Sequence, residues 1–152
     1  MTGTAFIRSQ SELPRKLNVL GEHITVLASG GATGGYEIFR QEGKPGHGPP
    51  PHAHDWDESF LVVSGKVEIG IGERSVICGP GSIAHVPAGT SHWFRFETGG
   101  EMISVTSKLG ASEFFADVDR AAPKGPLDLE TTLAVAERHG LTVFAPAAGA
   151  LI

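Results

Sequence analysis

Short hydrophobic runs separated by glycine- and proline-rich turns recur along most of the chain. Val67, Ile69 and Ile71 alternate with Lys66, Glu68 and Gly70. Alternation with a period of two is typical of a strand with one buried face. Comparable short runs predict further strands over 24–28, 35–41, 60–63, 75–78, 82–86, 92–97 and 102–106. Such closely spaced strands predict a closed antiparallel barrel or a sandwich.

The last third of the chain has a different pattern. Residues 111–119 contain Phe114 and Phe115 and predict a short helix. A second helix is predicted after Asp128, which is a good N-cap residue, and Gly140 lies where a C′ glycine would end it. We therefore expect an all-β barrel followed by a helical tail.

The length and composition favour one globular domain. The chain has 152 residues, of which 40% are hydrophobic and 19% are charged, so it can bury a core of the size that one domain needs. We expect a single domain over residues 1–152, with the barrel at about 24–107 and the helical tail at about 111–140, packed outside the barrel.

Charge and cysteine content narrow the partners and the compartment. The net charge is −5 and no cluster of Lys or Arg occurs, so we expect neither nucleic acid nor a membrane surface as a partner. No run approaches the roughly 20 apolar residues of a membrane span, and residues 1–10 lack the apolar run of a signal peptide. The single Cys78 permits no internal disulfide. These features predict a cytoplasmic protein.

Three residues in a short window have the chemistry of metal ligands. His52 and His54 are two residues apart, so in an extended segment their side chains share one face. Glu58 follows four residues later in the same phase. Two neutral imidazoles beside a carboxylate suit a divalent ion of borderline hardness.

A second window supplies a fourth candidate ligand. A turn at Pro87 and Gly89 leads to His92, whose in-phase neighbours are Phe94 and Phe96. Inside a barrel, His92 would meet the first three ligands. The sequence thus predicts a metal site formed by three histidines and one glutamate, with one or two coordination positions open. The side chains predicted to line it are Phe60, Val62, Phe94 and Phe96.

The spacing of the first window resembles a known family motif. Gly46, His52, His54, Glu58 and Gly65 occur with the spacing of the first cupin motif. The match holds at every fixed position of that motif.

The second window resembles the second cupin motif, with one departure. Gly81, Pro87, Gly89 and His92 match, whereas Phe96 stands where the family usually has Asn. The resemblance implies a cupin fold, the double-stranded β-helix or jelly-roll barrel. It also implies one divalent transition metal per chain, Fe, Mn, Ni, Co or Zn, on the four ligands named above.

The chain is also similar to single-domain cupins related to quercetin 2,3-dioxygenase, through residues 58–65 and 110–115. That similarity implies a metal-dependent dioxygenase acting on a small hydroxylated aromatic or enol substrate. Glu58 would be a fourth metal ligand or the base for the substrate hydroxyl. The alternatives are a metal-dependent isomerase or decarboxylase of a small oxo-acid or sugar, and a non-catalytic barrel that binds a small ligand.

Further roles follow from strand parity and from surface pattern. Tyr36 and Arg40 are in phase on an early strand and are predicted to orient a substrate oxygen. His47 could touch a ligand or lie on an exposed loop, and His85 could support the site or be a core residue. Residues 60–63 are apolar on both faces of their strand, so a second sheet or a partner chain must cover one face. We expect a homodimer.

Overall fold

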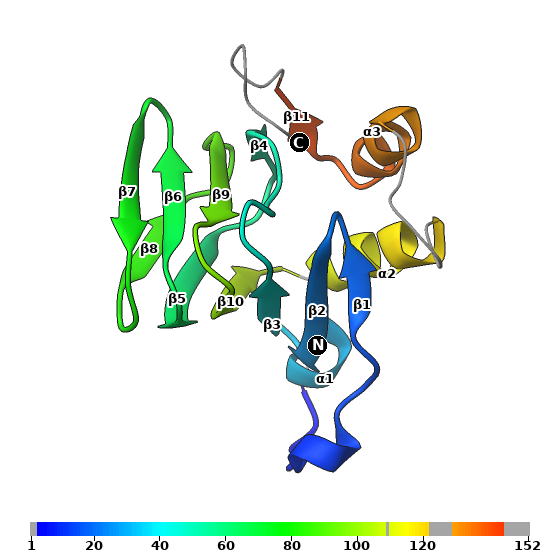
Figure 1. Cartoon of the computed structure of the whole chain (residues 1–152). Coiled ribbons are helices and arrows are strands. Elements are labelled where there is room, and N and C mark those ends of the chain that lie inside the picture. Colours follow the sequence, from blue (N-terminus) through cyan, green and yellow to red (C-terminus); the bar gives the residue numbers. More distant parts are fainter. Residues whose placement is uncertain (1–2, 109, 122–128, 145–152) are drawn as a thin grey trace.

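The computed structural model describes residues 3–108, 110–121 and 129–144. Two antiparallel sheets face one another (Figure 1). The larger sheet has the strand order β1 (Leu17–Val19), β2 (Glu22–Ala28), β3 (Tyr36–Gly43), β10 (Gly100–Ser107), β5 (Glu58–Ser64) and β8 (Ile83–Val86). The smaller sheet has the order β11 (Thr142–Val143), β4 (His52–Ala53), β9 (His92–Phe96), β6 (Val67–Ile71) and β7 (Arg74–Cys78). The predicted all-β barrel with a short helical tail is confirmed.

The two longer helices, α2 (Ala111–Ala121) and α3 (Leu129–Arg138), lie on the side of the molecule where β1 and β2 are (Figure 1). The single turns are η1 (Gln10–Glu12), which precedes β1 in the chain, and α1 (Gly30–Thr33), which follows β2. α2 packs against β1 and α3, and α3 packs against β11. Gly140, two residues after the end of α3, has a φ of +74°, as expected of a C′ glycine. The predicted N-cap Asp128 lies outside the described residues.

Inward-facing side chains of both sheets fill the space between them. Alternation along β6 and β9 buries one face of each strand, which is the period-two pattern of a half-buried strand. The buried cluster between the sheets consists of Phe60, Val62, Val67, Ile69, Val86, Phe94, Phe96 and Met102. This core forms the floor beneath the histidines of β4 and β9.

Phe96, the one departure from the second motif, is part of this core. Its side chain is completely buried and lies against Gly43 at the end of β3. A Cβ on Gly43 would come within 2.1 Å of the Phe96 ring, so the aromatic side chain depends on a glycine at that position. Phe96 therefore occupies space that only the missing Cβ of Gly43 leaves open.

A second core joins the N-terminal strands to the helices. Its buried residues are Val19, Ile24, Phe39, Trp56, Ala111, Phe114, Phe115, Val118, Val135 and Ala136. Glu37, which is fully buried on β3, accepts hydrogen bonds from the backbone N–H of Gly30, at 2.9 Å, and of Ser112, at 3.0 Å. It also accepts one from the Ser112 hydroxyl. The predicted helical tail therefore packs on β1, β2 and β3 and forms a second hydrophobic core with them.

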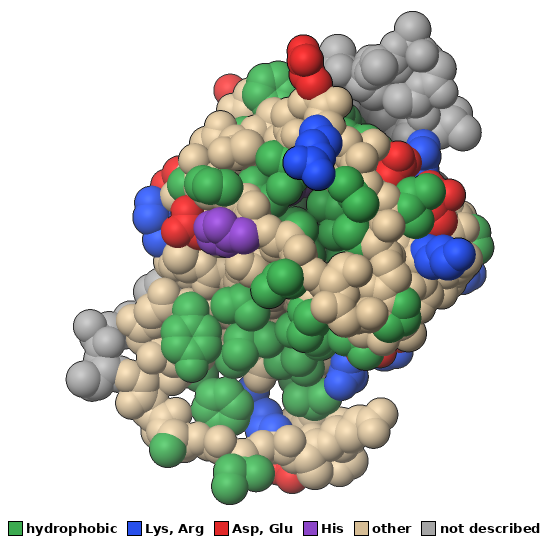
Figure 2. Space-filling view, turned by 90° about the vertical axis from the view of Figure 1, so that its left-hand side faces the viewer, with side chains coloured by type: hydrophobic (Ala, Val, Ile, Leu, Met, Phe, Trp, Pro, Cys, Tyr) green, Lys and Arg blue, Asp and Glu red, His purple; other side chains and the backbone are tan. Residues whose placement is uncertain are grey.

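The outer face of the larger sheet is left uncovered. Phe60 and Val62 point inward on β5, whereas Leu61 and Val63 are 43% and 44% exposed. Ile83 on β8 is 73% exposed. Figure 2, seen from the side of β7 and β8, shows hydrophobic side chains grouped on this side of the molecule. No second sheet of the described chain covers this face, so the homodimer remains a prediction. Among the described residues, no helix has both the length and the apolar character needed to cross a lipid bilayer.

Candidate metal centre

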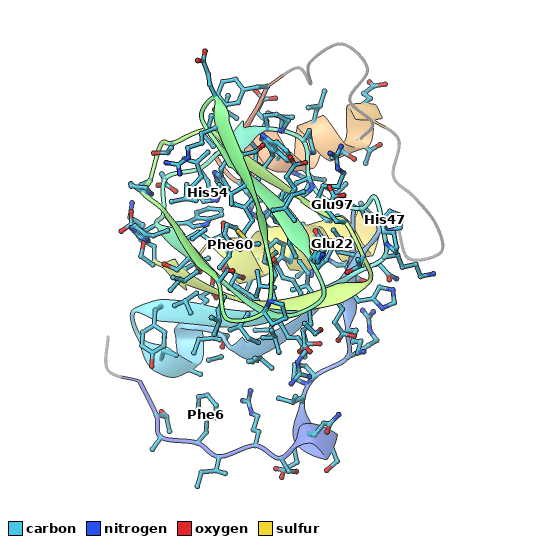
Figure 3. The ribbon with its side chains drawn as sticks, turned by 60° about the vertical axis from the view of Figure 1, so that its left-hand side comes forward. Phe6, Glu22, His47, His54, Phe60 and Glu97 are labelled. Carbon is cyan, nitrogen blue, oxygen red and sulfur yellow. The ribbon has the colours of Figure 1, made fainter. Side chains whose placement is uncertain are left out.

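The two histidine motifs meet across one pair of strands. His52 on β4 lies directly opposite His92 on β9 in the antiparallel register, and their ring centroids are 4.2 Å apart. The ring of His54, just beyond β4, lies 4.8 Å from that of His92 and 5.5 Å from that of His52. Figure 3 shows His54 within the body of the protein, together with Phe60 from the core below. The three rings therefore converge from two strands that are distant in sequence.

The turn that leads into β9 is bound to the first motif. Gly89 has a φ of +79°, a left-handed conformation that glycine adopts without a steric penalty. Its N–H donates to the carbonyl of His54 at 2.8 Å. The neighbouring Ala88 N–H donates to the carboxylate of Asp57 at 2.9 Å. These bonds hold the two ligand-bearing segments in one arrangement.

Backbone carbonyls set the orientation of all three rings. Nδ1 of His52 lies 2.9 Å from the Pro50 carbonyl, Nδ1 of His54 lies 3.0 Å from the Trp56 carbonyl, and Nδ1 of His92 lies 2.9 Å from the Thr90 carbonyl. A carbonyl only accepts, so each Nδ1 carries a proton, which leaves Nε2 as the nitrogen available to a metal. A second hydrogen bond of this kind is the usual support of a metal-ligating histidine.

Glu58 completes the cluster. Its Oε2 lies 3.0 Å from Nε2 of His54 and 3.5 Å from Nε2 of His92, and its side chain is 6% exposed. Burial raises the pKa of this carboxyl, but the hydrogen bond of His54 and the close approach of His92 outweigh burial and lower it to about 2. Burial, and then the charge of His92, lower the pKa of His52 to about 3. Glu58 is therefore ionised and His52 neutral at neutral pH, which are the forms that bind metals.

The donor set fits a divalent transition metal. One ligand nitrogen from each histidine lies within 4.8 Å of the others, and Nε2 of the buried His92 has no hydrogen-bond partner among the described residues. Imidazole nitrogens and a carboxylate at these separations repel one another unless a proton or a metal cation lies between them. Bonds of roughly 2.0–2.2 Å to one ion would place neighbouring ligand atoms about 3 Å apart, close to the separations at Glu58. The residues therefore fit the ion that the sequence predicts.

A cavity of about 70 Å³ opens beside this cluster. His52, His54 and Glu58 lie in its wall. The rest of the wall is mainly apolar and includes Val19, Leu20, Ile24, Pro49, Pro50, Trp56, Phe94, Phe114, Phe115, Ala136, Leu141 and Val143, with Glu22, Gln41 and Thr132 as polar members. A mostly apolar cavity with a few convergent polar groups is the usual form of a small-molecule site.

Comparison with known proteins agrees with the topology and both motifs. The profile of the family described as "Cupin domain" matches residues 39–106, a range that contains all four candidate ligands. Residues 39–106 of the chain therefore form a cupin domain. Quercetin 2,3-dioxygenase of Bacillus subtilis (strain 168) is 35% identical to the chain over 96 residues, which are 60% of this chain and 28% of that protein. The chain thus spans less than a third of the length of this curated relative.

Solved structures agree on the fold. An RmlC-like cupin from Shewanella frigidimarina NCIMB 400 superposes with a TM-score of 0.62 at 19% identity, covering 70% of this chain and 94% of the other. The polyketide cyclase RemF from Streptomyces resistomycificus superposes with a TM-score of 0.56 at 18% identity, covering 68% and 78% of the two chains. At these identities the likeness concerns the fold alone.

The structure separates the predicted pocket residues of this chain into two groups. Phe94 lines the cavity, whereas Phe60, Val62 and Phe96 lie in the core below the histidines. Of the four predicted pocket residues, only Phe94 therefore reaches the cavity, and the other three belong to the core between the sheets.

The parity predicted for the early strand was wrong. Tyr36 is 49% exposed, and Arg40 forms an ion pair with Glu101 of β10 at 2.7 Å; neither lines the cavity. Glu37, Phe39 and Gln41 are the buried residues of β3. The physical reason is that Glu37 is held inside by its hydrogen bonds to Gly30 and the start of α2, which the alternation of β3 does not reveal.

His47 and His85 lie outside the cluster. Nδ1 of His47 lies 2.9 Å from the carbonyl of Gly21, in the turn between β1 and β2. Nδ1 of His85 lies 2.9 Å from the hydroxyl of Ser59, on the exposed side of β8. Neither side chain lines the cavity.

Several cavity residues were not identified from the sequence. The Trp56 ring stacks on that of His54 with a centroid separation of 4.2 Å and an interplanar angle of 11°. Phe114 and Phe115 reach the cavity from α2, and Glu22 and Gln41 reach it from β2 and β3. The position of Trp56 between His54 and Glu58 was the available signal, whereas nothing local marks Glu22.

Proposed function

We propose that this chain binds one divalent transition metal and acts as a metal-dependent dioxygenase on a small hydroxylated aromatic or enol substrate. The metal ligands would be His52, His54, Glu58 and His92. The observation that carries the proposal is that three imidazoles and one ionised carboxylate lie together, with His52, His54 and Glu58 in the wall of a mainly apolar cavity. The similarity to the quercetin 2,3-dioxygenase of Bacillus subtilis supports the reaction class.

Such a metal, when bound, supplies Lewis acidity that favours the ionised form of a substrate hydroxyl and, if it is redox-active, a partner for O₂. The protein supplies the surroundings. Glu58 is ionised and lies in the cavity wall, so its carboxylate can bind the metal or accept the hydrogen bond of a substrate hydroxyl. Phe94, Phe114 and Phe115 exclude water and offer flat apolar contacts to a ring.

The cavity favours a small substrate. Its volume of about 70 Å³ is well below the several hundred Å³ typical of pockets for drug-sized ligands. We therefore infer a substrate with a single ring or a short enol rather than a multi-ring flavonol. The mainly apolar lining favours this class over a charged oxo-acid or sugar, which would serve the alternative isomerase or decarboxylase.

Metal content provides the first test. Protein purified without a His-tag or chelator should contain about one transition metal per chain by elemental analysis. His92→Ala should lose the metal, whereas His85→Ala, which removes an imidazole outside the cluster, should retain it. Wild-type metal content in His92→Ala, or a wild type that stays empty when incubated with Fe(II), Mn(II), Ni(II), Co(II) and Zn(II), would contradict the proposal.

Oxygen uptake provides the second test. The metal-loaded protein should consume O₂ with a small phenol or enol, and His92→Ala should not. Substrate turnover without O₂ uptake would favour the isomerase or decarboxylase, and binding without turnover would favour the ligand-binding barrel.

A further inference from the structure

Two buried side chains in the cavity wall each carry one oxygen atom without a hydrogen-bond partner among the described residues. Glu22 and Gln41 are each 3% exposed, and Oε1 of each has no hydrogen-bond partner within the described part of the chain. Both line the same cavity as His52, His54 and Glu58. A buried polar atom without a partner destabilises the fold, so such atoms are uncommon in native proteins. Two of them in one cavity indicate a ligand that supplies the missing hydrogen bonds.

The two side chains occupy neighbouring positions on a rigid wall. β2 pairs with β3 so that Ile24 lies opposite Gln41. Glu22 lies two residues before Ile24, so its side chain points to the same face of the sheet. Figure 3 shows Glu22 within the body of the protein, away from the N-terminal arm that carries Phe6.

The chemistry of this pair is that of an uncharged binding site. Burial, and then the negative charge of Glu58, raise the pKa of Glu22 well above its ordinary value, which favours the carboxylic acid. No ion pair joins Glu22 to a cation in the ranges that the structure describes. A carboxylic acid offers one donor and one acceptor, and the Gln41 amide offers two donors and one acceptor.

We propose that Glu22 and Gln41 form a subsite that binds an uncharged hydroxyl or carbonyl oxygen of the substrate, remote from the oxygen that the metal centre receives. The proposal rests on the proposed function, because it assigns a second polar contact to a substrate of that cavity. The subsite selects a ring with a second neutral oxygen over the same ring without it. It disfavours an anionic group at that position, since the cavity wall is mainly apolar and contains no Lys or Arg among the described residues.

The test measures binding rather than turnover. Zn(II)-loaded protein is titrated by calorimetry with phenol and with each of the three dihydroxybenzenes. The ratio of the Kd for phenol to the Kd for the tightest-binding dihydroxybenzene is then compared between the wild type and the variants. One added hydrogen bond in a dry site predicts a ratio of about ten in the wild type. Glu22→Leu and Gln41→Leu should each bring the ratio close to one without changing zinc content, and Glu22→Gln should keep most of it.

A matched control is available on the same strand. The hydroxyl of Thr25 is also buried without a partner, but Thr25 does not line the cavity. Thr25→Val should therefore leave the ratio unchanged. In addition, Glu22→Leu should not lower the urea midpoint of the ligand-free protein, because it removes an unpaired group; a purely structural role would lower it. If Glu22→Leu does not fold, Gln41→Leu provides the same reading of the ratio.

The proposal is overturned if the wild type binds phenol and the dihydroxybenzenes equally, or if Gln41→Leu keeps the wild-type ratio. Its failure is distinct from failure of the proposed function. A Kd ratio of about ten in a protein that consumes no O₂ contradicts only the proposed dioxygenase activity. A Kd ratio of one in a protein that consumes O₂ contradicts only the proposed subsite.

Discussion

Replacing Gly43 with alanine tests whether Phe96 depends on the missing side chain. A Cβ at position 43 would lie 2.1, 2.3 and 2.7 Å from three ring atoms of Phe96, whereas carbon atoms in contact are normally about 3.5–4.0 Å apart. The ring cannot move easily, because it is fully buried and packs edge-on against Phe94 at 5.9 Å. The Phe96 backbone is also held by hydrogen bonds to Gly46 and His47.

The expected effect of Gly43→Ala is a loss of about 2 kcal/mol in the free energy of unfolding. Overpacking of a buried site costs about 1–3 kcal/mol, and the lower entropy of the unfolded alanine chain offsets at most about 1 kcal/mol of it. Gly99→Ala is the matched control, since its nearest contact for a Cβ is at 3.9 Å. We expect the control to change stability by less than about 0.5 kcal/mol.

A double-mutant cycle isolates the contact. Phe96→Ala alone should cost about 3–5 kcal/mol, and in that background the added methyl of Gly43→Ala enters the vacated space and its cost should vanish. The coupling should therefore be about 2 kcal/mol, measured by urea unfolding of the four metal-free proteins. If Gly43→Ala costs the same with and without the Phe96 ring, or no more than Gly99→Ala, the packing argument is refuted.

Two further predictions concern the ligands and their supports. In the metal-free protein the pKa of His52 is about 3, below its ordinary 6.5. On acidification the unfolded chain therefore takes up a proton at His52 before the folded chain does. The stability contributed by neutral His52 is complete above pH 6.5 and is lost as the pH falls toward 3. Urea titrations should show a loss of about 2 kcal/mol between pH 7 and pH 5 that is absent from His52→Asn, and the same loss in that variant would disprove the assignment. Gly89→Ala should strain a turn with a φ of +79° by about 1–2 kcal/mol and weaken metal binding in a competition titration with a chelator. Gly79→Ala, where a Cβ meets nothing within 4 Å, should bind metal as the wild type does, and equal affinities of the two variants would contradict the role of the turn.

Local pattern was sufficient for the all-β fold class and for the first three candidate ligands. A strand repeats every two residues, so the alternation around Val67 and Ile69 already distinguishes an inner face from an outer face. The spacing of His52 and His54 places both rings on one side of an extended segment for the same reason. The family motifs then related these residues to His92, which local pattern by itself only suggested.

The sequence of β3 did not show which of its two faces is buried, because apolar and polar residues occur on both. Along β3 the exposed Tyr36 is aromatic, whereas the inward Glu37 is charged. A rule that places apolar residues inside therefore selects the wrong face. Glu37 is buried because Ser112, 75 residues later in the chain, supplies its hydrogen bonds.

The sequence by itself therefore determined the antiparallel barrel and the identity of the candidate ligands, because period and spacing are properties of neighbouring residues. Tertiary structure decided where the cavity lies and what lines it, because Glu22, Trp56 and Phe114 come from three separate segments of the chain. It also decided the orientation of the histidine rings, since each Nδ1 is fixed by a carbonyl whose direction depends on the folded backbone. Contacts between residues far apart in sequence leave no periodic signal, so only the folded chain reveals them.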